Sequence, residues 1–217
     1  MTAMMERHGP ELLEPQDQPV LPLLRVIQEN ASETELTQIF YQLRALLPED
    51  PERSRTIVGW YMLLRQSPEY YSIAASVIYF IVDCVCATGN LQDLKDYVTK
   101  NTSYKSDVNI PRLTLRQMLS RIMNRMNESE AQKLIGLVSR LHLGTPPDSY
   151  KQLHKLFEMM EKKGLLIPSN QNLPELCACF QQLGRNDIIK EFLVLYDPHH
   201  RISLPVLSGI NSKLHSC

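Results

Sequence analysis

Residues 23–46 (LLRVIQENASETELTQIFYQLRAL) and residues 118–141 (MLSRIMNRMNESEAQKLIGLVSRL) match without a gap when the chain is shifted by 95 positions. In both stretches apolar residues recur at the 3.6-residue spacing of an amphipathic helix. A short polar stretch then intervenes, and the apolar spacing resumes after it. The match predicts two consecutive helices in each copy and an internal repeat in the chain.

The polar residues between the two helices match as well. Ser32 and Glu35 in the first copy correspond to Asn127 and Glu130 in the second. Each pair has the form of a capping box, in which the first side chain accepts from the N–H three residues on. The glutamate accepts in return from the N–H of the cap residue. We therefore expect a helix to begin just after Ser32 and another just after Asn127.

Later features of the two copies follow in the same order, with small gaps. These are Cys84-Val85-Cys86 against Cys177-Ala178-Cys179, and the turn 89–94 (GNLQDL) against the turn 184–188 (GRNDI). Agreement of caps, cysteines and turns predicts two copies of one helical unit, each about 75–80 residues long.

The composition favours a folded helical protein. Of the 217 residues 43% are apolar and 22% charged, which is enough apolar material for a core. Only 8 glycines against 14 prolines argue against a glycine-rich nucleotide-binding fold or a β-sandwich, and no long period-two alternation predicts a strand. We expect an all-α fold of two tandem helical bundles, with a solenoid of stacked helical hairpins as the alternative.

The pattern divides the chain into five parts. They are a polar arm at 1–19, a first bundle at 20–100, a linker at 101–111, a second bundle at 112–196 and an irregular tail at 197–217. The helices of the second bundle are expected near 112–126, 128–143, 148–163, 172–183 and 185–195. Gly164 and Pro168 separate the third of these helices from the fourth.

The longest apolar run is Ile73–Val82, closed by Asp83. A bilayer requires about 20 apolar residues, so this run predicts a buried core helix and no membrane partner. The chain opens without the pattern of a secretory signal, and its five cysteines are not spaced as a disulfide scaffold. A reducing compartment follows as the expectation, cytoplasmic or else nuclear.

The cysteines and histidines do not have metal-ligand spacing. Residues two apart on a helix point in nearly opposite directions, so each Cys-x-Cys pair predicts free core cysteines rather than a zinc site. The six histidines are scattered, and no phosphate-binding loop or nucleophile motif is present. We expect no metal, no cofactor and no enzymatic activity.

A series of basic residues begins the second copy: Arg112, Arg116, Arg121, Arg125, Lys133 and Arg140. Residues four apart share a helix face, which could hold RNA or an acidic partner. No aromatic residues alternate with them to stack on bases, and the net charge of the chain is -1. We interpret the series as a solvated helix face.

Arg185 and Asp187 stand at the start of the last predicted helix. The two side chains can pair with each other and with an acidic residue of a neighbouring helix, and a charged surface group of this kind suits reciprocal protein contacts. An ordinary first helix turn, where aspartate is favoured by the dipole, is the other interpretation.

With these residues in place, the second copy resembles a death effector domain, with spacing close to that of the adaptor FADD. The resemblance is carried by Leu115, Leu119, Ile122, the capped helix from Asn127, Leu156, Phe157, the stretch 161–165 (EKKGL), Leu176, Phe180 and Arg185-x-Asp187-Ile188. It implies that Glu130, Arg185 and Asp187 form the charge triad of that family. The Phe-Leu pair through which the family docks partners would fall near Gly136-Leu137.

The first copy looks like a divergent member of the same family. Asp93-Leu94 keeps the end of the signature, but Leu91 takes the place of the arginine, and the docking pair falls near Tyr41-Gln42. Two units and a short tail resemble the FLIP-type inhibitors. The resemblance implies a non-enzymatic adaptor or inhibitor that acts by homotypic assembly and regulates caspase recruitment and apoptosis.

The partners implied are death-effector-domain adaptors or caspases, with self-association of the chain as a further expectation. The expected partner-binding residues are Glu130, Arg185, Asp187, Asp93, Arg121 and Arg125.

A rival resemblance concerns the stretch 156–164 (LFEMMEKKG), followed by Pro168 and Leu183-Gly184-Arg185, which looks like a pentatricopeptide or tetratricopeptide hairpin. Such repeats stack into scaffolds that hold a peptide or RNA. A clean period of about 34 residues does not run through the chain, whereas the 95-residue offset does.

Overall fold

The computed structural model describes residues 20–47, 55–71, 73–86, 110–144, 152–169 and 173–196. Their regular structure is entirely helical, so the expected all-α fold is confirmed. The arm 1–19, the tail 197–217 and residues 101–109 of the expected linker lie outside the described residues. Pro111, expected to end the linker, is instead the first residue of a helix, a position that suits proline because it needs no N–H donor.

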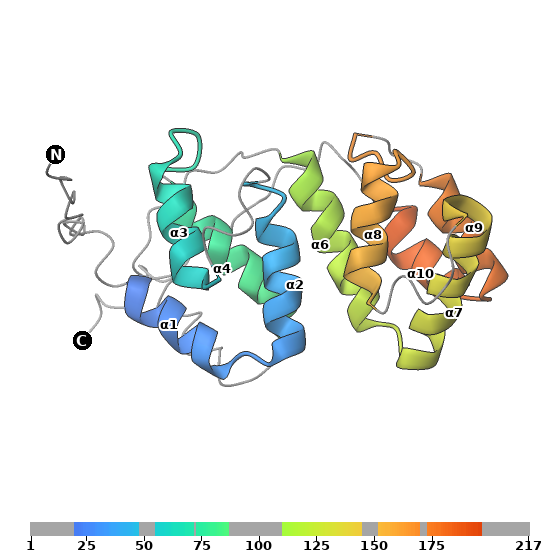
Figure 1. Ribbon diagram of the computed structural model, residues 1–217, viewed down its shortest axis with the longest axis horizontal. Coiled ribbons are helices and arrows are strands. Elements are labelled where there is room, and N and C mark those ends of the chain that lie inside the picture. Colours follow the sequence, from blue (N-terminus) through green and yellow to red (C-terminus); the bar gives the residue numbers. More distant parts are fainter. Residues whose placement is uncertain are drawn as a thin grey trace, which may run out of the picture.

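The first unit consists of helices within 20–86 that surround one core (Figure 1). They are α1 (Val20–Asn30), α2 (Glu33–Leu43), α3 (Ile57–Gln66) and α4 (Ala74–Val85). Trp60 of α3 is 1% exposed at the centre of this core. The apolar run predicted as a core helix is α4, and Asp83 is its exposed position, which confirms that prediction. Within the described ranges, no helix is long and apolar enough to cross a membrane.

The second unit, within 110–196, has its own core, to which Phe157, Met160 and Phe180 contribute fully buried side chains. Its elements are α6 (Pro111–Asn124), α7 (Glu128–Val138), the π-helical turn η3 (Ser139–Leu143), α8 (Leu153–Lys162), α9 (Pro174–Gln182), α10 (Asn186–Ile188) and the π-helical turn η5 (Ile189–Leu193). The predicted helices are all present within a few residues, except that residues 148–151 lie outside the described residues. Gly164 adopts φ 71° after α8, the left-handed conformation that favours glycine at a helix end.

Both predicted capping boxes are present. The Ser32 hydroxyl accepts from Glu35 N at 3.2 Å, and the Asn127 side chain accepts from Glu130 N at 2.9 Å. Each glutamate carboxylate accepts in return from the N–H of its cap residue. Four pairs of apolar positions that match across the repeat are buried in both units: Leu24 with Leu119, Ile27 with Ile122, Ile39 with Leu134, and Leu43 with Val138. Leu46 differs, because its match Leu141 is 54% exposed.

The two units meet at α6, which lies between the first-unit helices and α8 (Figure 1). Both α2 and α4 pack against α6. Tyr41 of α2 is part of the second core, while Leu113 of α6 is part of the first. The two cores are therefore joined through side chains that cross between them.

A buried ion pair lies at this contact. Arg116 of α6 bonds the Glu161 carboxylate of α8 through Nε at 3.0 Å and Nη2 at 3.1 Å, and these side chains are 4% and 5% exposed. The Nη1 group of Arg116 donates to the backbone carbonyl of Tyr41, and the guanidinium carbon lies 4.6 Å from the centre of the Tyr41 ring. Arg112 Nε and the Tyr41 hydroxyl also donate to Glu161, at 3.1 and 3.3 Å. Burial and the charge of Glu161 raise the pKa of Tyr41 well above its usual value, so the hydroxyl stays protonated and remains a donor.

Further polar contacts run along the same contact surface. Two side chains of α2 and that of Arg44, the residue after it, reach the second unit. The contacts are Gln38 Nε2 to Asn124 Oδ1 at 2.8 Å, Gln42 Nε2 to Ser120 Oγ at 3.1 Å, and Arg44 Nη2 to Glu158 Oε1 at 3.5 Å. Hydrogen bonds have directional geometry, so these contacts fix the register of α2 on α6 more tightly than apolar packing alone would.

The interpretation of the basic series as one solvated face is wrong for Arg116, whose side chain is buried, whereas the Arg112 side chain is 40% exposed. Both face Glu161, and Arg116 is covered by α2. The spacing of four correctly placed them on one helix face, but α6 turns that face toward α8 and the other unit. Arg121 and Arg125 lie five and nine residues beyond Arg116 on other faces, and both are exposed.

We predict that Glu161→Leu lowers the free energy of unfolding by about 3–5 kcal/mol, because it leaves the Arg116 charge buried and unpaired. The double variant Glu161→Leu, Arg116→Met should be more stable than Glu161→Leu alone, since it removes both charges. Urea unfolding followed by circular dichroism measures both values.

The matched control is Glu191→Leu, which breaks the exposed Arg125–Glu191 pair and should cost less than about 1 kcal/mol. Equal losses for Glu161→Leu and Glu191→Leu would contradict the role assigned to the buried pair.

Candidate protein-interaction site

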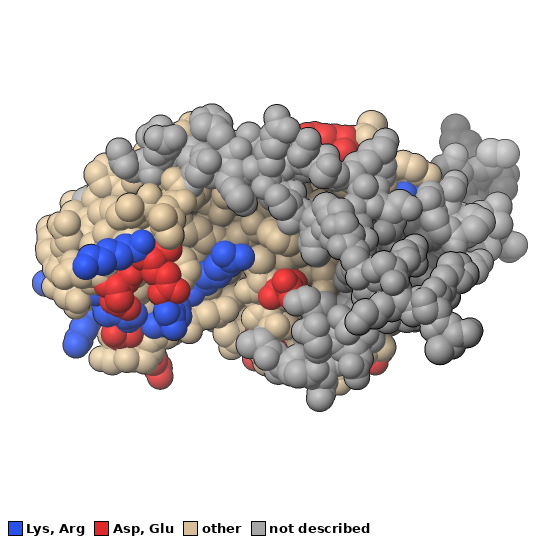
Figure 2. Space-filling model, turned by 180° about the vertical axis from the view of Figure 1, so that it is seen from behind, with Lys and Arg blue, Asp and Glu red and all other residues tan. Residues whose placement is uncertain are grey.

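Glu130, Arg185 and Asp187 meet on the surface of the second unit. Arg185, just before α10, donates two hydrogen bonds to the Asp187 carboxylate, Nε to Oδ1 at 2.9 Å and Nη2 to Oδ2 at 2.7 Å. Its Nη1 group lies 2.8 Å from Oε1 of Glu130 on α7. Figure 2 shows basic and acidic side chains gathered at the end of the molecule formed by the second unit. The predicted pairing of Arg185 with Asp187 and with an acidic residue of a neighbouring helix is confirmed.

Local structure holds each member of this charge triad in place. Glu130 is fixed at its other oxygen, because Oε2 accepts from Asn127 N at 3.0 Å in the capping box. Arg185 donates in addition to the backbone carbonyl of Arg125, at 3.4 Å from each of two nitrogens. The three side chains are 27%, 18% and 56% exposed for Glu130, Arg185 and Asp187. Asp187 is thus the member most available to a partner.

The geometry shifts the pKa values of all three groups toward their charged forms. The hydrogen bonds from Arg185 lower the pKa of Asp187 to about 2. The backbone N–H of Asn127, with Arg185 as a further cause, lowers the pKa of Glu130. The hydrogen bond to Asp187 is the largest cause that raises the pKa of Arg185. The triad is therefore fully ionised across the physiological pH range.

The other expected partner-binding residues are distributed differently. Arg125 lies beside the triad, and its side chain pairs with Glu191 at 2.7 Å. Arg121 is exposed but faces the first unit, with Nη2 3.8 Å from the Cys84 sulfur. The structure does not bring Arg121 into the triad. Asp93 lies outside the described residues.

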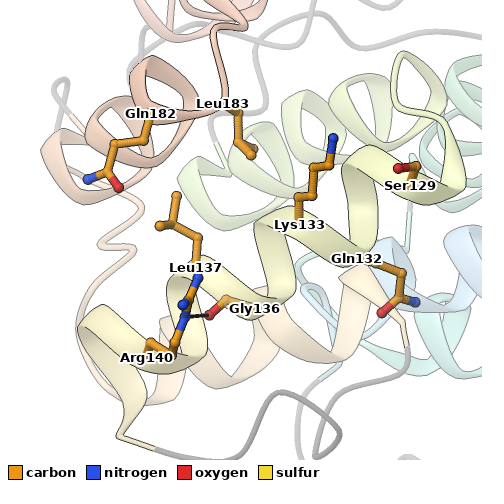
Figure 3. Close-up of a pocket in the computed structure, with 8 residues that line it drawn as sticks. All are labelled: Ser129, Gln132, Lys133, Gly136, Leu137, Arg140, Gln182 and Leu183. Carbon is orange, nitrogen blue, oxygen red and sulfur yellow. Dashed lines mark hydrogen bonds between the residues drawn. The ribbon is translucent and has the colours of Figure 1, made fainter.

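A groove of about 630 Å³ runs between α7 and the end of α9, at the position that the resemblance assigns to the docking pair. Leu137 of α7 and Leu183 after α9 face one another across it, with Lys133 of α7 and Arg140 of η3 beside them (Figure 3). A Cβ atom built on Gly136 would meet nothing within 4 Å, so the groove is open at the position where the family's phenylalanine would stand.

The corresponding residues of the first unit are not available to a partner. Tyr41 and Gln42, which match Gly136 and Leu137 in the repeat, are both 0% exposed at the contact with α6. Matching positions of the repeat therefore have different surroundings in the two units. In the first unit these positions join the two halves of the molecule, and in the second they line an open groove.

The described cysteines are free, as expected. Only Cys179 is fully buried; Cys84, Cys86 and Cys177 are partly exposed, so the prediction that all are buried is wrong for these three. Burial raises the pKa of the Cys86 thiol to about 12 and that of Cys179 to about 11, so both remain thiols at neutral pH. Among the described residues, no group of three or more His, Cys, Asp or Glu side chains could hold a metal ion.

Sequence reasoning missed Glu161 and Tyr41 as the residues that join the units, and Leu183 as the far wall of the groove. Glu161 is buried between helices, and the only signal in the sequence is a glutamate on the apolar side of α8, one position after the buried Met160. Comparisons of the chain with protein family models, curated proteins and solved structures gave no match.

We predict that the Asp187 carboxyl titrates with a midpoint near 2 in the folded chain and that Arg185→Gln raises this midpoint toward its usual value of 3.8. A lowered pKa means that the pairing stabilises the fold above about pH 4, and this contribution is lost as the pH falls toward 2. Carbon-detected NMR of the aspartate side chains, recorded while native signals persist, measures the midpoint. An unchanged midpoint in Arg185→Gln would contradict the hydrogen bonds assigned between Arg185 and Asp187.

Proposed function

We propose that the chain is a non-enzymatic interaction protein that assembles homotypically with death-effector-domain proteins and so regulates caspase recruitment and apoptosis. The observation that carries this proposal is the Glu130–Arg185–Asp187 triad, an ordered and exposed charge network. Residues far apart in the sequence converge there, and the Asp187 side chain remains 56% exposed. Exposed ion pairs contribute little to stability, so its order is better explained by partner recognition.

The groove beside α7 supports the same proposal. It offers apolar side chains, Leu137 and Leu183, next to the cations Lys133 and Arg140. An apolar patch with a charged border is the usual anatomy of a protein interface. Charge on the border sets the register of a partner, and apolar contact supplies affinity.

The burial of the matching surface in the first unit suggests how the chain would act in an assembly. Because Tyr41 and Gln42 are buried against α6, only the second unit presents this surface openly. A chain of this kind would join a growing assembly through its second unit and leave the matching position of its first unit unable to accept the next member. This is how an inhibitor would act.

The rival proposal, a helical-repeat scaffold for a peptide or RNA, has less support. It needs the basic series to form one continuous open surface, but Arg112 and Arg116 bind Glu161, while the exposed Arg121 and Arg125 lie on other helix faces. It is therefore kept as an outcome of the experiment below.

The test is binding of the purified full chain to the FADD death effector domain, measured by biolayer interferometry. We expect binding at micromolar affinity and a loss of at least about tenfold in Arg185→Glu, Asp187→Arg, since charged contacts at an interface each contribute on the order of 1–3 kcal/mol. The matched control is Arg25→Glu, Glu29→Arg, a charge reversal at two exposed positions of α1, which should bind normally.

A further variant probes the groove in the same experiment. Gly136→Phe restores the family's aromatic residue where there is open space, and tighter binding is expected because the new ring adds apolar contact area. Absence of binding at tens of micromolar by a chain with a normal helical spectrum would overturn the homotypic assignment and favour the scaffold.

A further inference from the structure

A second hollow, separate from the triad and the groove, lies between the two units. It has a volume of about 380 Å³ and is bordered by the first turns of α2 and α7, the turn between α6 and α7, and the start of α8. We call it the junction pocket. It exists only because α2 is held against α6, so neither unit alone would form it.

Two largely buried polar side chains line the junction pocket, and one of them has a buried oxygen without a hydrogen-bond partner. Gln38 is 7% exposed; its Nε2 donates to Asn124, but its Oε1 has no partner. His154 is also 7% exposed, and in the part of the chain that the structure describes nothing hydrogen-bonds its imidazole. Burial is the main cause that lowers the pKa of His154 to about 4, so the ring is neutral at physiological pH and offers an acceptor nitrogen. A buried acceptor without a partner, such as the Gln38 oxygen, is costly, which indicates a site that can accept from a donor.

The charged residues that line the pocket also favour a ligand whose hydrogen-bond donor group is positively charged. Glu33 and Glu128 stand in the first turns of α2 and α7, and neither makes an ion pair within the described residues. None of the residues that line the pocket is a lysine or an arginine, although Arg44 and Lys155 are near enough to contribute to the lowered pKa of His154. The helix N-termini would by themselves attract an anion, but both are already capped by carboxylate-bearing side chains, Glu35 and Glu130.

The pocket wall between these polar groups is apolar and adaptable. Met123 and Met126 line it together with Leu153. Methionine side chains fit irregular aliphatic stems, because their thioethers are flexible and polarisable. The pocket thus combines an apolar wall, a buried oxygen acceptor and two carboxylates.

We propose that the junction pocket binds the side chain of an arginine presented by a partner protein. The aliphatic stem lies against Met123 and Met126, and the guanidinium reaches the Gln38 oxygen and the Glu33 and Glu128 carboxylates. Arginine fits better than lysine because its planar fork carries five N–H donors and can serve several acceptors at once. This site does not depend on the proposed homotypic assembly and would let a second partner bind while the triad is occupied.

The test uses the full chain labelled with ¹³C at the methionine methyl groups, titrated with Nα-acetyl-arginine methylamide. The Met123 and Met126 signals, assigned from Met→Leu variants, should shift saturably with a Kd of about 1–10 mM, as expected for so small a probe. The citrulline analogue, which has the same shape without the charge, should bind at least about fivefold more weakly.

The double variant Glu33→Gln, Glu128→Gln should weaken binding of the arginine probe by at least about tenfold, since it removes both charge-assisted contacts. Neither residue takes part in the capping boxes, so the fold should persist, as an unchanged signal from the buried Met160 would show. The matched control, Glu29→Gln, Glu175→Gln, changes the net charge equally away from the pocket and should bind as the original chain does.

Three results would overturn the proposal: no saturable shift of Met123 or Met126, equal affinity for the arginine and citrulline probes, or normal binding by the Glu33→Gln, Glu128→Gln variant. Each can be observed whether or not the FADD domain binds, so this proposal and the homotypic one can fail separately.

Discussion

The Glu161 carboxylate, buried between two helices and two units, is the constraint on which the arrangement of the molecule depends. It accepts hydrogen bonds from Arg112, Arg116 and Tyr41, which together satisfy both of its oxygens. A charge at this depth is tolerable only when its partners are held in place. Because Arg116 also donates to the backbone of α2, the position of the first unit is tied to the internal packing of the second.

This constraint explains why two copies of one repeat have different surfaces. Tyr41 and Gly136 occupy the same position of the repeat. The Tyr41 hydroxyl donates to Glu161 of the buried ion pair, whereas Gly136 lines an open groove. Because α2 packs against α6, the surface around Tyr41 is not accessible to solvent. The second unit keeps the surface around α7 and carries the ordered charge triad, and the hollow between the units appears as a by-product of the same contact.

Local features of the fold were predictable because their causes are local. The capping boxes at Ser32 and Asn127 involve atoms three residues apart, and the helical periodicity identifies the buried positions of each unit. The pairing of Arg185 with Asp187 could also be predicted, because the two residues are only two positions apart, and Glu130 came from the resemblance.

The contact between the two units at α6 could not be predicted in this way. Arg116 and Glu161 are 45 residues apart, and the sequence does not show which face of α6 is covered by the other unit. The series of arginines was therefore misinterpreted as a solvated face. The junction pocket was beyond prediction for the same reason, since Gln38 and His154 become neighbours only after the two units pack together.

The most direct test of whether the Arg116–Glu161 pair joins the two units follows each unit separately during unfolding of the full chain. Trp60, the only tryptophan, reports on the first core through its fluorescence, and the Met160 methyl signal reports on the second. If the buried pair makes the units one cooperative body, both probes should give the same urea midpoint and slope. Two clearly separate transitions would contradict this, since they would show that the units unfold independently and that Glu161 does not join them.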